Sequence, residues 1–113
     1  MERLKIIAFT HKSIELADLS RFFIDEKERP ERLKGIKEAI GAKELFYIAT
    51  CNRVEFVFVA DKALDDQLLH TFFTAVSNTY SADQLTWLEQ QCVKLEGEAA
   101  LKHLLEVTAS LDS

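Results

Sequence analysis

Cys51 has the clearest chemical potential in this sequence, because it lies in a short polar break between two apolar runs. The runs, residues 45–48 and 56–59, are rich in the aromatic and β-branched side chains typical of strands. A thiolate is a strong nucleophile, and a nearby cation such as Arg53 raises the thiolate fraction at neutral pH. An unreactive, half-buried cysteine in a turn fits the same residues, and their spacing alone leaves both readings open.

Three histidines could serve as a base for this thiol. His103 lies beside the apolar stripe of the last predicted helix, so its ring could reach a sheet packed against that helix. His70 is expected at a margin of the core, and His11 at the end of the first strand. On spacing alone, a structural histidine between helix and sheet also explains His103.

Other kinds of site find little support in the sequence. Cys92 is expected inside the fourth strand as a small apolar core residue. The two cysteines have no metal-ligand spacing, and they do not form a Cys-x-x-Cys redox pair. The sequence also lacks a glycine-rich phosphate loop and paired carboxylates. We therefore predict no metal site and no cofactor site on this chain.

The composition predicts one folded domain, residues 1–113. Apolar residues make up 48% of the sequence, and one Pro and three Gly exclude a low-complexity chain. A net charge of −5 means that any nucleic acid must be held at a local site or with help from another domain. No run approaches the roughly 20 apolar residues of a membrane span, and no secretion signal follows Met1. We expect a cytoplasmic domain with reduced thiols.

The apolar patterns predict four strands, at residues 3–10, 44–50, 53–60 and 91–95. Helices are expected after Ser13, from Pro30 to Gly41, and over residues 61–78, 81–90 and 98–110. This order predicts an α+β, ferredoxin-like sandwich, in which helices cover a four-stranded antiparallel sheet and an extra helix follows at the C-terminus.

Three details of this prediction bear on the site. The second and third strands should form a tight hairpin with Cys51 at its tip, where Asn52 tolerates a left-handed backbone. The first helix should bury one face, and the last helix another. The first face comprises Leu16, Leu19 and Phe23, and the second comprises Ala100, Leu101, Leu104, Leu105 and Thr108.

Three segments together resemble the N-terminal catalytic domain of glutamyl-tRNA reductases. They are His-Lys-Ser at 11–13, Thr-Cys-Asn-Arg-Val-Glu at 50–55, and residues 98–113, which contain His103-Leu104 and end in Leu-Asp-Ser. The resemblance covers essentially the whole chain. Its Thr-Cys-Asn-Arg segment is specific, whereas His-Lys-Ser alone would be weak.

The resemblance implies that Cys51 attacks the ester of glutamyl-tRNA, forming a thioester and releasing tRNA. Thr50, Asn52 and Arg53 would hold the glutamyl group, His103 would assist catalysis, and Ser113 would contact the substrate. An activated ester suits a thiolate that lacks an elaborate triad, and the Arg53 guanidinium can bind a carboxylate through two hydrogen bonds.

The resemblance further implies that NADPH reduces the thioester to glutamate-1-semialdehyde, which feeds tetrapyrrole and haem synthesis. NADPH-binding and dimerisation domains would lie outside this sequence, so the chain alone is expected to lack hydride transfer. The expected partners are glutamyl-tRNA, a second copy in a homodimer, and glutamate-1-semialdehyde aminotransferase as recipient of the product.

Some residues depart from the family pattern. Ser13-Ile14-Glu15 replaces Thr-Ala-Pro, Ser110 replaces a glycine, and Glu106 stands where a basic residue is common. These changes affect the expected contacts of the first helix and any phosphate contact near Glu106. A non-catalytic ferredoxin-like binding module is the alternative function.

Overall fold

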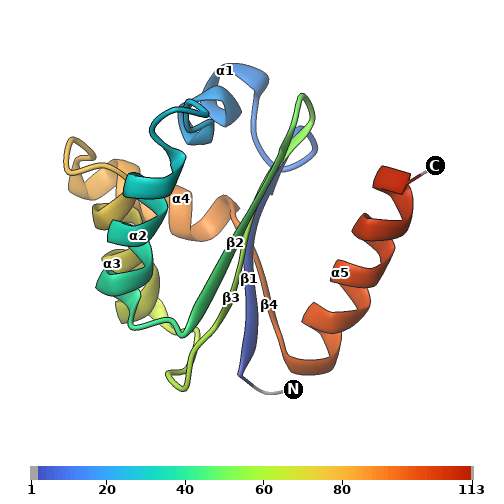
Figure 1. Cartoon of the computed structure of the whole chain (residues 1–113). Helices are drawn as coiled ribbons and strands as arrows, with labels where there is room; N and C mark the ends of the chain where they lie inside the picture. The colour runs from blue at the N-terminus through green and yellow to red at the C-terminus, as the bar shows by residue number, and fades with distance from the viewer. Residues whose placement is uncertain (1–2, 113) are drawn as a thin grey trace.

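Four apolar runs form the strands of one sheet in the computed structural model, which describes residues 3–112, with side chains for residues 3–109. The strands are β1 (Leu4–Thr10), β2 (Glu44–Thr50), β3 (Arg53–Val59) and β4 (Val93–Glu96). They lie in the order β2-β3-β1-β4, and all neighbours are antiparallel. The predicted four-stranded antiparallel sandwich is therefore confirmed (Figure 1).

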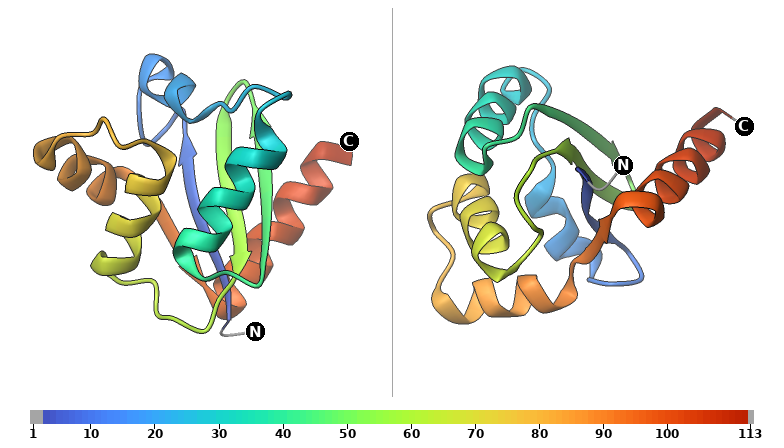
Figure 2. Two further views of the ribbon diagram at one scale, coloured as in Figure 1. Left: turned by 60° about the vertical axis from the view of Figure 1, so that its left-hand side comes forward. Right: turned by 90° about the horizontal axis from the view of Figure 1, so that it is seen from below.

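Helices pack on both faces of this sheet (Figures 1 and 2). One face carries four helical segments and a single turn of 3-10 helix, and the opposite face carries the extra C-terminal helix. The first group is α1 (Leu16–Leu19), the 3-10 turn η1 (Ser20–Phe22), α2 (Arg29–Ile40), α3 (Asp66–Val76) and α4 (Ala82–Gln91). The last helix, α5 (Gly97–Asp112), follows β4 through Gly97, whose φ of 61° is a conformation that favours glycine.

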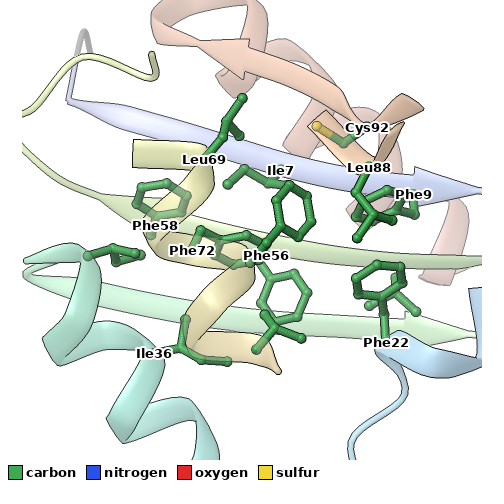
Figure 3. Close-up of a cluster of buried hydrophobic side chains, with 14 of the residues drawn as sticks. Ile7, Phe9, Phe22, Ile36, Phe56, Phe58, Leu69, Phe72, Leu88 and Cys92 are labelled. Atoms are coloured by element: carbon green, nitrogen blue, oxygen red, sulfur yellow. The ribbon is translucent and has the colours of Figure 1, made fainter. Parts of the chain in front are cut away.

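The main core lies between the sheet and the first group of helices (Figure 3). Alternate residues of β1 and β3 point into it, among them Phe9 and Phe56. The ring of Phe22 stacks on Phe9 with centroids 4.2 Å apart, which fixes η1 against the end of β1. This contact places the segment that follows His11 over the same end of the sheet as the β2–β3 turn.

A smaller core lies under α5. It is built from Ile6, Ala8, Val57 and Ala100. Because side chains alternate along a strand, β3 directs Arg53 and Glu55 to the same face as Val57. The polar end of β3 therefore faces α5.

The first helix differs from its prediction. Ser13 does not cap it, because the helix begins after Glu15, and the Ser13 hydroxyl instead accepts a hydrogen bond from the Thr10 N–H at 3.0 Å. Leu19 is buried as predicted, but Leu16 and Phe23 are exposed and Phe22 is buried. The predicted face was wrong because the helix tightens into η1 after four residues, which changes its phase.

The boundaries of α3 and β4 also differ from prediction. Helix α3 begins at Asp66 rather than near residue 61, because the Asp65 carboxylate accepts a hydrogen bond from the Leu68 N–H and caps the helix there. Cys92 is the C-cap of α4 and not a strand residue, since its N–H still bonds the Leu88 carbonyl. It is nevertheless buried, as predicted.

Two further predictions were wrong. Leu105 is 61% exposed and Thr108 is exposed, whereas Val107 is buried, because α5 contacts the sheet along a narrower stripe than its sequence pattern suggests. Asn52 does not adopt a left-handed backbone, and within residues 3–112 only Gly41 and Gly97 have positive φ.

Candidate active site

Cys51 lies at the tip of the β2–β3 hairpin, as predicted. Thr50 and Arg53 pair across the strands, so Cys51 and Asn52 alone form the turn. The thiol is free and the residue is exposed. The Asn52 N–H donates to Thr50 Oγ1 at 3.3 Å, and the Asn52 carbonyl accepts from the His11 N–H at 2.9 Å. The turn is therefore tied to the segment after β1 while its sulfur remains accessible.

Beside this turn, the buried carboxylate of Glu55 organises two of the predicted site residues. Its Oε2 accepts a hydrogen bond from Arg53 Nη1 at 3.0 Å, and its Oε1 lies 2.6 Å from His103 Nε2. Glu55 is 1% exposed, and burial of a carboxylate is costly unless such partners compensate for lost hydration. An ionised carboxylate only accepts hydrogen bonds, so with Glu55 ionised the His103 proton lies on Nε2.

Small side chains bring His103 within reach of Glu55. Glu55 pairs with Ala8 of β1, and Ala100 of α5 is fully buried against the same patch. His103 follows Ala100 by three residues and so lies on the same face of α5, one turn closer to the hairpin. The prediction that this ring reaches the sheet is confirmed by its contact with Glu55.

Arg53 and His103 thus meet at a carboxylate, not at the thiol. Within residues 3–112, the side-chain hydrogen bonds of both go to Glu55, and neither is bonded to the Cys51 sulfur. Sequence reasoning missed Glu55, although a signal was present. It is the one charged residue inside an otherwise apolar stretch of strand, at the same alternation as Arg53.

The remaining predicted residues lie outside the Glu55 cluster. Thr50 is half-buried at the end of β2, and Asn52 is exposed beside Cys51. Ser113 lies outside the described residues. His70 is exposed on α3, and among the described residues no hydrogen bond joins it to the Arg53–Glu55–His103 cluster. Burial raises the pKa of the Cys92 thiol, which suits the predicted unreactive core cysteine.

Comparison with known proteins identifies the family. The family model for the N-terminal domain of glutamyl-tRNA(Glu) reductase matches residues 7–113. The chain belongs to this family. The resemblance drawn from the three sequence segments is confirmed.

Curated relatives agree with the family assignment. Glutamyl-tRNA reductase 2 of Nocardioides sp. is 32% identical over 114 residues, which cover 100% of this chain and 24% of the relative. Glutamyl-tRNA reductase of Syntrophus aciditrophicus is 33% identical and is matched over 96% of this chain and 25% of the relative. The chain therefore spans about a quarter of the length of these relatives.

A solved structure shares the fold. Glutamyl-tRNA reductase from Methanopyrus kandleri superposes with a TM-score of 0.63 at 21% sequence identity, over 100% of this chain and 24% of that one. Among residues 3–112, no cluster of three or more His, Cys, Asp or Glu side chains could hold a metal ion. No helix in the same range is long and apolar enough to cross a membrane.

Proposed function

We propose that this chain is the acyl-accepting domain of a glutamyl-tRNA reductase, in which Cys51 takes the glutamyl group from glutamyl-tRNA. The observation that carries the proposal is the position of an exposed thiol at a two-residue turn beside the Arg53–Glu55–His103 cluster. The thiolate attacks the ester carbonyl, the C–S bond forms, and the C–O bond to the ribose breaks. The ribose oxygen leaves and takes up a proton.

Arg53 binds the side-chain carboxylate of the glutamyl substrate. One guanidinium nitrogen, Nη1, donates to Glu55, and the side chain remains 35% exposed. Its other N–H groups are free to bind a second carboxylate through the two-bond geometry that a guanidinium allows. The buried Glu55 charge also balances the guanidinium when no substrate is present.

His103 is the proposed group for proton transfer during the attack of the Cys51 thiol on the ester. With Nε2 held by Glu55, the second ring nitrogen, Nδ1, is available to accept or deliver a proton. Glu55 fixes the orientation of the ring in the same way that a carboxylate orients the histidine of a catalytic triad. We propose that His103 protonates the leaving ribose oxygen or withdraws the thiol proton, with Thr50, Asn52 and Ser113 contacting the glutamyl group.

The reduction step belongs to the rest of such an enzyme. The described sheet is entirely antiparallel, and the sequence has no glycine-rich loop between a strand and a helix. These residues therefore do not fit a dinucleotide site of the Rossmann type. We propose that NADPH binds outside this chain, and that the part played by these residues ends at the thioester.

The wider setting is proposed on the same basis. The full enzyme would act in the cytoplasm as a homodimer and produce glutamate-1-semialdehyde for tetrapyrrole synthesis. It would pass this aldehyde to glutamate-1-semialdehyde aminotransferase, since a free amino aldehyde is reactive in water.

Transfer of labelled glutamate tests the proposed function. The chain is mixed with radiolabelled glutamyl-tRNA in a single turnover, and protein-bound label is counted after acid precipitation and RNase digestion. We expect label on the chain that hydroxylamine releases, its absence in Cys51→Ser, and its retention in the matched control Cys92→Ser. Absence of label in the unsubstituted chain, with intact glutamyl-tRNA, would support the alternative of a binding module.

A further inference from the structure

Three connected hollows cross the helical layer on the side of the sheet opposite to α5. The first has a volume of about 510 Å³ and lies against His11, Lys12 and Glu15. The second, about 280 Å³, lies between η1 and α4, and it shares Asp18 and Trp87 with the first. A third, about 380 Å³, adjoins the second. The third shares Arg21, Tyr80 and Gln84 with the second and adds Arg32.

The first hollow begins beside the thiol turn. Its wall includes His11, whose N–H donates to the Asn52 carbonyl at 2.9 Å, and Asn52 is the neighbour of Cys51. The loop that leads from β1 toward α1 is joined to the tip of the β2–β3 hairpin by this bond. A substrate whose reactive group lies at Cys51 can therefore extend from the turn along the first hollow. This path leads away from the Glu55 cluster, which lies on the opposite face of the sheet.

The walls of these hollows combine aromatic rings with cations. Trp87 is 40% exposed although its side chain is large and apolar, and Tyr80 is half-buried next to it in the second hollow. Lys12, Arg21 and Arg32 outnumber the two carboxylates in the walls, in a chain whose net charge is −5. With histidine neutral, these walls therefore carry one more positive charge than negative charge.

Arg21, Arg32 and the phenol of Tyr80 line the third hollow together. Burial raises the pKa of Tyr80, and the guanidinium groups of Arg21 and Arg32 oppose that shift. Arg32 is held in place by donating to the Val76 carbonyl at 2.7 Å. Arg21 is exposed, and among the described residues it makes no ion pair. An anion between these side chains would find two cations and one hydroxyl.

We infer that the three hollows bind the unpaired 3′ end of the RNA substrate, with a base on Trp87 and phosphates at Lys12, Arg21 and Arg32. This inference rests on the function proposed above, because the glutamyl ester connects the terminal ribose to the carbonyl that Cys51 attacks. Single-stranded RNA is held by exposed aromatic rings on which bases stack, together with cations that follow the backbone. The path from the thiol turn past Trp87 to Arg32 provides an exposed aromatic ring and, along the same path, the cations.

Tryptophan fluorescence tests the stacking contact directly, because Trp87 is the only tryptophan in the chain. The chain is titrated with a short RNA hairpin that ends in an unpaired, single-stranded CCA trinucleotide. We expect saturable quenching of the emission, and no quenching by the same hairpin with a blunt end. Equal responses to both RNAs, or no response to either, would overturn the inference.

Kinetics separate this inference from the proposed function. Trp87→Ala and Arg21→Ala should each raise the KM for glutamyl-tRNA about tenfold, the size expected for loss of one stacked base or one phosphate contact. Trp87→Phe, which retains a stacking ring, should recover most of the loss. Lys34→Ala is the matched control for Arg21→Ala, because this exposed lysine of α2 lines none of the three hollows.

Acylation of Cys51 by a small activated glutamyl thioester provides the second readout. Trp87→Ala and Arg21→Ala should raise the KM for glutamyl-tRNA and leave the reaction with the small thioester unchanged. The KM of the Arg21→Ala variant for glutamyl-tRNA should also depend less on salt concentration than that of the unsubstituted chain. If neither substrate acylates Cys51 in the unsubstituted chain, the proposed function fails. If both substrates react normally in Trp87→Ala, only the RNA site is wrong. Quenching by a protein partner but not by RNA would assign these hollows to a protein.

Discussion

The carboxylate of Glu55 lies 2.6 Å from Nε2 of His103, although 48 positions separate the two residues in the chain. Glu55 comes from the central strand β3, and His103 comes from α5, which packs on the opposite face from the main core. The site therefore exists only when α5 is docked on the sheet. The contact joins Glu55, which also binds Arg53, to the histidine that we propose as the proton-transfer group.

Replacing Glu55 tests that contact. Glu55→Gln keeps the volume and removes the charge, so Arg53 and His103 lose a charge-assisted partner worth about 1.5–3 kcal/mol. We expect single-turnover acylation of Cys51 to slow by about ten- to a hundredfold. Glu55→Asp should recover part of the rate, and an unchanged rate in Glu55→Gln would show that the contact is only structural.

Arg53→Lys tests recognition of the substrate carboxylate. Lysine keeps the charge but lacks the planar fork that binds two oxygens while one nitrogen is held by Glu55. We expect the KM for glutamyl-tRNA to rise about tenfold. Selectivity against glutaminyl-tRNA should fall, as measured by competition between the two substrates. Lys102→Ala, an exposed charge on α5, serves as the control for a general electrostatic effect.

The two cysteines should differ in their reaction with iodoacetamide. Cys51 is exposed, so it should be labelled first and at least tenfold faster, as measured by mass spectrometry of tryptic peptides. Burial disfavours the Cys92 thiolate and raises its pKa, so labelling of Cys92 in the folded chain should require a higher pH than an ordinary thiol. Similar labelling of both at neutral pH would contradict the nucleophile assignment.

The same raised pKa predicts a dependence of stability on pH. Below the ordinary thiol pKa, Cys92 is protonated in both the folded and the unfolded chain, so it adds no pH dependence. As the pH rises from that value toward the raised pKa, only the unfolded chain ionises, and the free energy of unfolding falls. Cys92→Ala should show a smaller loss of stability over this range than the unsubstituted chain, as measured by urea unfolding.

The Tyr47 hydroxyl should contribute to stability because it joins β2 to the last residue of η1 and to the segment that follows it. It accepts from the Ile24 N–H at 3.0 Å and donates to the Phe22 carbonyl at 2.9 Å. Tyr47→Phe leaves both backbone groups without this partner, so we expect a loss of about 1–3 kcal/mol in the free energy of unfolding. Tyr80→Phe is the control, because its hydroxyl has no hydrogen bond within residues 3–109, and its effect should be below about 0.5 kcal/mol.

Local sequence determined much of the framework. The β2–β3 turn follows from two strand-forming runs with only two residues between the paired Thr50 and Arg53. Pro30 lies in the first turn of α2, and Gly41 ends the helix with a φ of 67°, as their backbone preferences dictate. These features depend on steric and hydrogen-bonding preferences of neighbouring residues, so they could be predicted from the chain alone. The accessibility of Cys51 is one of them.

Tertiary packing decided the rest. The phase of the short helix at residues 16–22 was set by the stacking of Phe22 on Phe9, which no local pattern specifies. Likewise, Leu105 is exposed and Val107 buried because α5 contacts only part of the sheet. In the sequence, Glu55 is a charged residue within an apolar strand and His103 lies beside an apolar stripe, but neither position identifies the other as its partner. Their contact depends on strand alternation, the small residues Ala8 and Ala100, and the docking of α5, and it becomes visible only when distant elements pack together.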